Sequence, residues 1–145
     1  MIKIICFGKL KEKYLEELVN DYVKRINKYH KIEILNLKDE NDMKKEKESL
    51  LRYLNKDHYN ILLDIDGSLY NSVEFSKKIN STFIQNSTIT FVIGGSDGVS
   101  EDIKHLFNER ISFSKFTLPH GLFRGVLLEQ IYRSFKIENN EGYHK

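Results

Sequence analysis

The residues of this sequence whose side chains could form a reactive site are concentrated in its last third. A histidine, two arginines and a glutamate share one helical stretch, and a second histidine follows a tyrosine near the last residue. Histidine and glutamate can act as general bases, arginine and lysine hold phosphates, and tyrosine stacks on nucleobases. A packing helix with a solvated tail is the alternative, and the residue types leave it open. The residues are His120, Arg124, Glu129, Arg133, Tyr143, His144 and Lys145.

A pair of carboxylates follows an apolar run in the middle of the chain, where Leu62-Leu63 leads into Asp64 and Asp66 in the pattern DxDGSL. One aspartate can attack phosphorus while the other acts as an acid or base beside Mg²⁺. The pattern is similar to the nucleophile motif of haloacid-dehalogenase-type phosphatases. That motif opens the core sheet of those enzymes, whereas here two predicted strands and two predicted helices precede it. The preferred interpretation is therefore a strand that ends in a polar turn.

A glycine-rich segment, residues 94–98 (GGSDG), follows another apolar run. Glycine lets the backbone approach a ligand closely, and α/β folds bind small molecules at the carboxyl ends of parallel strands. The spacing matches neither the dinucleotide-binding GxGxxG pattern nor the P-loop, so it predicts no dinucleotide or nucleoside triphosphate. A tight turn without a ligand explains the glycines about as well.

Alternating strands and amphipathic helices must position these residues. Runs of β-branched residues predict strands over residues 2–7, 32–37, 59–65, 88–93 and 111–114. Apolar residues at helical spacing predict helices over 10–29, from the charged run 38–48 to Leu54, around 75–83, after a cap at Ser100, and over 120–135. This order predicts an α/β fold, a mostly parallel sheet flanked by helices, in a single domain over residues 1–145.

The last predicted helix has a broad apolar surface. Leu128 and Tyr132 widen its apolar stripe beyond one face, so other elements are expected to cover it on more than one side. The whole stretch 122–135 is also wide enough to suggest a subunit interface. Gly121 and Gly125, near the start of the helix, predict looser packing there.

Composition narrows the classes of protein that remain. The net charge of +2 permits an acidic partner such as RNA without requiring one. Cys6 is the only cysteine and lies in an apolar run, which predicts a core thiol in a reducing compartment. No apolar span reaches 18 residues and no secretion signal is recognised. We therefore expect a soluble cytoplasmic protein without a membrane segment and without a metal site.

Several motifs in a fixed order resemble one known family over essentially the whole chain. They are the opening KIICFGKLKEKY, the strand end LLDIDG, the turn GGSDG, then SFSKFTLPH, LFRGVLLEQIYRSFKI and the terminal GYHK. The family is the bacterial 23S ribosomal RNA methyltransferase H family of the SPOUT superfamily. A resemblance carried by this many motifs predicts both a fold and an activity.

The resemblance implies a homodimer that binds S-adenosyl-L-methionine in a C-terminal trefoil knot. It implies methylation of N3 of a pseudouridine in the helix 69 stem-loop of 23S rRNA, on assembled ribosomes. In SPOUT enzymes the tail of one subunit meets the cofactor of the other, so the site is composite. No compositional or spacing pattern predicts a knot, and knots are rare in proteins.

The resemblance also assigns roles to residues. The cofactor positions that carry over are Leu63, Gly94, Phe113, Ser114, Lys115, Phe116, Thr117 and Leu118. Methyl transfer needs alignment rather than a metal, and the attacking imide nitrogen must lose a proton to a base. His120, Glu129 and His144 are the candidate bases, with a helix-capping role as the alternative for His120. Arg124, Arg133 and Lys145 are candidates to hold RNA, and Tyr143 is a candidate to stack on a base.

Two other functions stay open on the sequence alone. One is a small Mg²⁺-dependent phosphatase that uses Asp64 and Asp66. The other is a ribosome-binding factor that has kept the fold without the cofactor. Binding of S-adenosyl-L-methionine would separate the methyltransferase from both.

Overall fold

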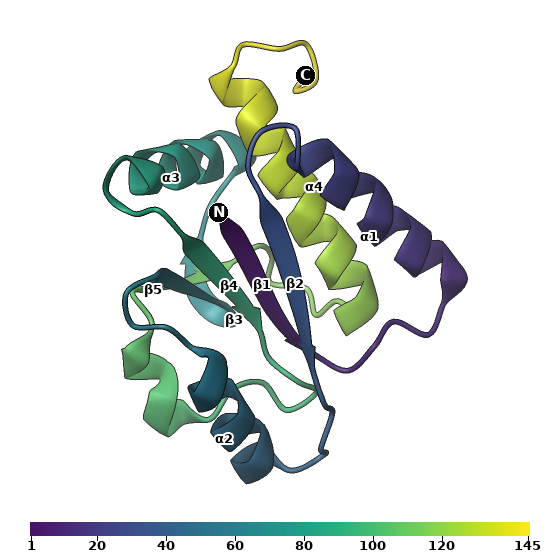
Figure 1. The fold of residues 1–145 in the computed structure, drawn as a ribbon, viewed down its shortest axis with the longest axis vertical. Helices are drawn as coiled ribbons and strands as arrows, with labels where there is room; N and C mark the ends of the chain where they lie inside the picture. Colours follow the sequence, from purple (N-terminus) through teal and green to yellow (C-terminus); the bar gives the residue numbers. More distant parts are fainter.

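A computed structural model describes all 145 residues as a parallel five-stranded sheet in the order β2-β1-β4-β3-β5, flanked by helices (Figure 1). The strands are β1 (Ile2–Phe7), β2 (Ile32–Leu37), β3 (Tyr59–Leu69), β4 (Ile89–Ile93) and β5 (Glu109–Ser112). The helices are α1 (Lys13–Ile26), α2 (Met43–Tyr53), α3 (Ser72–Gln85), the short 3-10 helix η1 (Glu101–Leu106) and α4 (His120–Glu138). The α/β class and the parallel sheet predicted from the sequence are confirmed.

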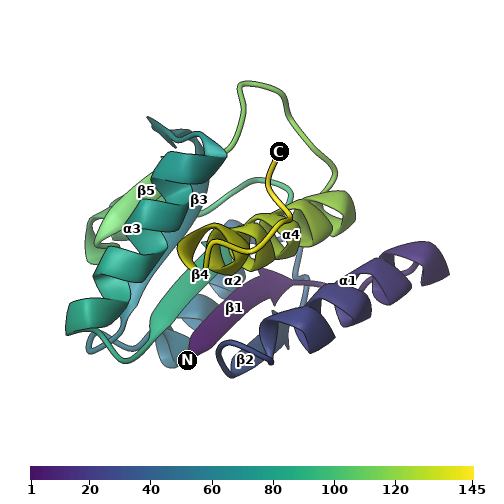
Figure 2. The same cartoon turned by 90° about the horizontal axis from the view of Figure 1, so that it is seen from above.

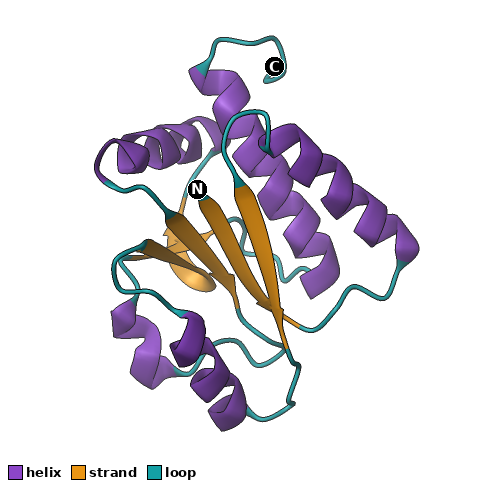
Figure 3. Ribbon diagram, in the orientation of Figure 1, coloured by secondary structure: helices purple, strands orange, loops and turns teal.

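Helices cover both faces of the sheet, as Figure 3 shows by element type. Successive strand residues point to opposite faces, so neighbouring isoleucines of β1 enter different cores. Ile4 joins the larger core under α1, α3 and α4, while Ile5 joins the smaller one under α2 and η1. Cys6 belongs to the larger core, and burial raises the pKa of its thiol. The core thiol expected from the sequence is therefore observed.

Helix α4 lies between α1 and α3 on one face of the sheet (Figure 2). Leu127, Leu128 and Ile131 are fully buried there, and Tyr132 is nearly so. The prediction that this helix is covered on more than one side is confirmed. The same packing corrects the expectation of a subunit interface over 122–135, because most of that apolar surface is used within one chain.

The two glycines of α4 allow close packing against α1, whereas the sequence predicted looser packing. A Cβ added to Gly121 would lie 2.8 Å from Leu15 Cδ1, and one added to Gly125 would lie 2.4 Å from Leu18 Cδ2. The leucines of α1 thus occupy the space that larger residues on α4 would need. The glycines therefore bring the two helices together.

Strand β3 is longer than predicted. It was expected to end at Asp66-Gly67 but continues to Leu69, with a break in register, since Leu63 and Ser68 both stand opposite Ile111 of β5. The residues between them bulge from the ladder. A Cβ added to Gly67 would lie 2.7 Å from backbone atoms of Arg110 and Ile111. Only glycine therefore fits where the bulge of β3 approaches β5.

Two neighbouring boundaries also differ from the prediction. The fifth strand spans 109–112 rather than 111–114, because residues 113–118 leave the sheet to form a loop. The short helix after β4 is a 3-10 helix, and Ser100 is its N-cap residue, as predicted, but the Ser100 side chain makes no capping hydrogen bond to the helix backbone. The Ser100 hydroxyl instead donates to the carboxylate of Asp102.

The edge strand β5 is fixed by a polar cluster at its first residue. The carboxylate of Glu109 forms an ion pair with Lys78 Nζ at 2.8 Å and accepts hydrogen bonds from the hydroxyls of Tyr59 (3.2 Å) and Tyr70. The hydrogen bond to Glu109, together with burial, raises the pKa of Tyr70 to about 12. Residues from β3 and α3 thereby hold the edge of the sheet.

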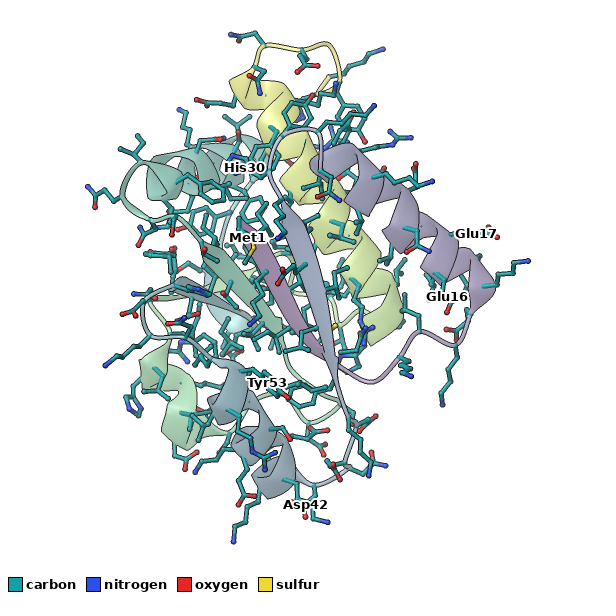
Figure 4. The ribbon with its side chains drawn as sticks, viewed as in Figure 1. Met1, Glu16, Glu17, His30, Asp42 and Tyr53 are labelled. Atoms are coloured by element: carbon teal, nitrogen blue, oxygen red, sulfur yellow. The ribbon has the colours of Figure 1, made fainter.

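Side-chain contacts also order the helix ends and the turns. Asp42, labelled in Figure 4 at the end of α2, accepts hydrogen bonds from the backbone N–H groups of Lys44 (3.0 Å) and Lys45 (3.3 Å). His30, labelled near α3 and α4, stacks on Phe83 at 4.3 Å. None of the helices combines the length and the apolar character that a membrane crossing requires.

We predict that Gly67→Ala destabilises the protein by about 1–3 kcal/mol, because the added methyl group meets backbone atoms of β5 that cannot rotate away. Urea unfolding followed by circular dichroism measures the change. Gly142→Ala is the matched control, because a Cβ there meets no atom within 4 Å. Equal stability of the two variants would contradict the close approach of the β3 backbone at Gly67 to the backbone of β5.

Candidate active site

A partly open cavity of about 260 Å³ lies at the carboxyl ends of β3, β4 and β5. This is the edge where parallel α/β sheets bind small molecules. The loop that leads from β5 to α4 forms part of its wall and arches away from the sheet in Figure 2. The lining residues are Leu63 to Ile65, Ile93 to Ser96, Gly98, Ile111 to Ser114, Phe116 to Leu118, His120 and Phe123.

Nearly all the residues expected to bind a cofactor meet at this cavity. They come from three strand ends that lie far apart in the sequence, and the parallel sheet brings them to one edge. Those that line the cavity are Leu63, Gly94, Phe113, Ser114, Phe116, Thr117 and Leu118. Lys115 is exposed beside them and does not line the cavity.

The glycine-rich segment after β4 forms a tight turn and also lines the cavity. The sequence left a tight turn and a ligand-binding turn as alternatives, and the structure is compatible with both. A Cβ added to Gly94 would lie 2.8 Å from the carbonyl carbon of Gly98. The turn closes through a hydrogen bond from Gly98 N to Gly95 O at 2.9 Å. Gly98 has a φ of +76°, a conformation that favours glycine.

A buried glutamate supports this turn from behind. Glu46 of α2 is 7% exposed, and a Cβ added to Gly95 would lie 2.5 Å from Glu46 Oε1. Its Oε2 accepts a hydrogen bond from Glu40 N at 3.2 Å. Burial, together with the nearby carboxylates of Asp39 and Asp97, raises the pKa of Glu46. Sequence reasoning missed this residue, because it lies in a mixed-charge run that predicts a solvated surface.

Asp64 is the only acidic residue that lines the cavity. Its Oδ2 lies 3.0 Å from Lys104 Nζ and 3.7 Å from Arg110 Nη1. Burial opposes ionisation, but the hydrogen bond from the backbone N–H of Asp66 and the positive charges of Lys104 and Arg110 outweigh it and lower the pKa of Asp64. Asp64 therefore carries a negative charge at neutral pH.

The arrangement expected for a phosphatase is not assembled around these two aspartates. Asp66 is exposed and does not line the cavity, and its backbone N–H donates to Asp64 Oδ1 at 3.1 Å. No group of three or more His, Cys, Asp or Glu side chains is placed to hold a metal ion. The two carboxylates lie in the bulged part of β3, and not in a turn at the end of the strand as the sequence predicted.

His120 is the one candidate base at the cavity. It is the first residue of α4, exposed, and it lines the cavity beside Phe123. The helix cap is Pro119, whose carbonyl accepts a hydrogen bond from Phe123 N at 2.9 Å. The capping role weighed for His120 is therefore filled by the backbone of Pro119.

Arg124 lies away from the cavity. It is 5% exposed, and its Nη2 donates to the carbonyls of Phe7 (2.7 Å) and Gly8 (2.8 Å). Its Nη1 donates to Asn36 Oδ1 at 3.0 Å. This guanidinium joins α4 to the ends of β1 and β2, so in a single chain it is not available to bind RNA.

The other catalytic candidates form a separate cluster near the opposite end of α4. Tyr143 donates to Glu129 Oε1 at 3.0 Å, and Arg133 Nε donates to the same oxygen at 2.9 Å. Arg133 Nη1 lies 3.1 Å from His144 Nδ1. Tyr22 of α1, which sequence reasoning missed, contacts the Tyr143 hydroxyl at 3.3 Å. None of these residues lines the cavity.

Four exposed apolar side chains lie on β3, on the loop from β5 to α4 and at the start of α4. Phe116, which lines the cavity, is 82% exposed, and Ile65, another lining residue, is 52% exposed. Leu69 and Leu122 are also exposed and belong to the same segments of chain, β3 and the start of α4. Two of these four exposed side chains, Ile65 and Phe116, therefore belong to the candidate site itself.

A comparison with known families identifies the class of protein. A family model described as "Predicted SPOUT methyltransferase" matches residues 1–144. The match includes every element of the sheet and every residue of the cavity. The chain therefore belongs to the SPOUT methyltransferase family.

Full-length relatives carry a more specific name, ribosomal RNA large subunit methyltransferase H. The proteins of that name from Malacoplasma penetrans (strain HF-2) and Clostridium botulinum (strain Eklund 17B / Type B) are 44% and 47% identical to this chain. The alignments cover 99% of this chain and 99% of each relative. The chain is thus a member of the methyltransferase H family, and the resemblance seen in the sequence is confirmed.

A solved structure supports the fold. The tRNA (m1G37) methyltransferase from Aquifex aeolicus superposes with a TM-score of 0.55 at 14% identity, over 91% of this chain and 69% of that one. At this identity the likeness concerns the fold alone. The trefoil knot implied by the resemblance stays a prediction.

We predict that Glu46→Gln stabilises the protein at neutral pH. A raised pKa means that the folded state binds the proton more tightly than the unfolded chain, whose ordinary value is 4.5. Below that value the carboxyl group is neutral in both states, and as pH rises through the folded pKa its ionisation disfavours folding. The gain should therefore appear above pH 4.5 and be absent below it.

Thermal unfolding of wild type and Glu46→Gln from pH 4 to pH 8 measures this dependence. Glu48→Gln is the matched control, because Glu48 is exposed on the same helix. A Glu46→Gln variant that is less stable than wild type at pH 8 would show that the ionised carboxylate supports the turn.

Proposed function

We propose that this protein uses S-adenosyl-L-methionine to methylate large-subunit ribosomal RNA, at N3 of a pseudouridine in the helix 69 stem-loop of 23S rRNA. The cavity at the carboxyl ends of β3, β4 and β5 carries this proposal. It is lined by seven of the eight residues that the family resemblance assigns to the cofactor. The names of the full-length relatives support the RNA substrate.

The residues of the cavity suit this cofactor. The lining is mainly apolar side chains, glycine backbone and hydroxyl groups, as the adenosyl portion requires. Its size is close to the roughly 300 Å³ at which small-molecule sites begin. Ser114 Oγ accepts a hydrogen bond from Phe116 N at 2.9 Å, and Ser112 Oγ donates to Ser114 O at 2.9 Å. These bonds shape the loop independently of a ligand.

S-adenosyl-L-methionine, when bound, supplies a methyl group on a sulfonium sulfur, and the protein must align an imide nitrogen with it and remove that nitrogen's proton. His120 is the only one of the three candidate bases that lines the cavity within one chain, which supports this role for it. Alignment and exclusion of water can supply a large part of the rate without a metal. The role proposed for His120 is to accept the proton as the nitrogen attacks.

The tail cluster completes the site from a second copy of the chain. Helix α4 spans 19 residues, about 28 Å at 1.5 Å per residue, and it separates the cavity at its start from the tail beyond its end. Tyr143, His144 and Arg133 therefore do not meet the cavity of their own chain. The exposed apolar surface at Phe116 and Leu122 gives a partner a place to pack. We propose a homodimer in which each tail faces the other subunit's cavity.

The proposed function is tested by two measurements on the wild-type protein. Calorimetry should detect binding of S-adenosyl-L-methionine, and ribosomes that lack the modification should gain one methyl group, mapped by mass spectrometry to helix 69. His120→Ala should keep cofactor binding and lose methylation by about 10²–10⁴-fold. Absence of binding at millimolar cofactor would reject the proposal, and methylation elsewhere in the RNA would reject the site.

The composite site is tested by mixing two inactive variants in one cell. Gly94→Val should prevent cofactor binding, because its side chain meets the backbone of Gly98, and deletion of residues 143–145 should remove the tail. In mixed dimers one cavity is intact and the intact tail of the partner faces it. Random pairing should restore about a quarter of wild-type methylation, since half of the dimers carry one working site.

The tail-deletion variant should bind the cofactor with nearly wild-type affinity when it is measured alone. Two variants that stay inactive when mixed, although mixed dimers are isolated, would place the whole site within one chain. A large loss of affinity in the deletion variant would show that the tail holds the cofactor itself.

A further inference from the structure

The cavity has a single acidic wall in an otherwise neutral lining. Apart from Asp64 and His120, its lining residues carry no ionisable side chain. The Asp64 side chain is 9% exposed, so only a small part of the carboxylate meets solvent. A ligand in this cavity therefore lies beside one buried negative charge.

Asp64 is held firmly in place from two sides. Its Oδ1 accepts a hydrogen bond from the backbone N–H of Asp66 at 3.1 Å, and its Oδ2 lies 3.0 Å from Lys104 Nζ. Lys104 is itself held by Glu101 at 2.7 Å. The carboxylate cannot easily turn away from a ligand or toward one, and this fixed geometry favours discrimination between ligands.

The cations that balance Asp64 lie behind it. Lys104 and Arg110 line a separate polar groove beside η1 and β5, which Glu101 and Glu109 also line, and neither cation lines the cavity. Asp64 thus belongs to the wall of the cavity, whereas the two cations that pair with it lie outside the cavity. A cationic ligand meets the carboxylate without a lysine or arginine in the same wall.

We propose that Asp64 makes the cavity selective for a cationic sulfur, so that the sulfonium cofactor binds more tightly than its neutral thioether product. This proposal rests on the proposed function. Methyl transfer breaks the bond between sulfur and the methyl carbon, and the sulfur keeps the electron pair and loses its positive charge. The attraction to Asp64 disappears with that charge, which favours exchange of product for fresh cofactor.

The test is calorimetric binding of S-adenosyl-L-methionine and S-adenosyl-L-homocysteine to wild type, Asp64→Asn and Lys104→Met. Both variants break the same ion pair, but only Asp64→Asn removes the carboxylate. In Asp64→Asn the affinity for the sulfonium ligand should fall by about tenfold and that for the thioether by less than about threefold. In Lys104→Met the preference for the sulfonium ligand should persist or increase.

The readout is the ratio of the two affinities within one variant. Partial unfolding lowers both apparent affinities by the same factor, so it does not change this ratio. Equal losses for the two ligands in Asp64→Asn would overturn the proposal, since the carboxylate would then hold a part that they share. Loss of preference in both variants would also overturn it. A wild type that binds neither ligand would instead reject the proposed function itself.

Discussion

Close backbone contact at two glycines is the constraint on which the site depends. Gly67 lets the bulge of β3 approach the backbone of β5 closely, and Gly94 lets the turn after β4 close on Gly98. A methyl group at either position would separate these segments. The parallel sheet brings three strand ends to one edge, and these two contacts keep the segments at that edge close together. The cavity is the space left between them and the loop that leads to α4.

Helix α4 links this edge to the rest of the molecule. Its first residue, His120, lines the cavity, its middle is buried between α1 and α3, and its last turns carry the tail cluster. Arg124 ties the same helix to the ends of β1 and β2. One rigid element thus fixes the position of both groups of candidate residues while keeping them apart. A site that uses both groups requires a second chain.

The sequence predicted local structure well and long-range contacts poorly. Runs of β-branched residues predicted the five strands, and apolar spacing of three or four residues predicted the main helices and the burial of α4, because both signals are local in the sequence. Three features depend on residues distant in the sequence. They are the close approach of Gly67 to β5, the burial of Glu46 and the hydrogen bonds of Arg124 to the ends of β1 and β2. Glu46 in particular lies in a charged run, so no local pattern distinguishes it from its solvated neighbours. The family resemblance assigned a cofactor role to eight residues, and the parallel sheet explains why seven of them line one cavity.

The binding of S-adenosyl-L-methionine in this cavity is tested most directly by hydrogen exchange followed by mass spectrometry, with and without saturating cofactor. We predict slower exchange in the turn at residues 94–98 and in the loop at 113–118, with little change in α1. Unchanged exchange in both segments, with protection elsewhere in a protein that demonstrably binds the cofactor, would contradict the assignment of the cavity.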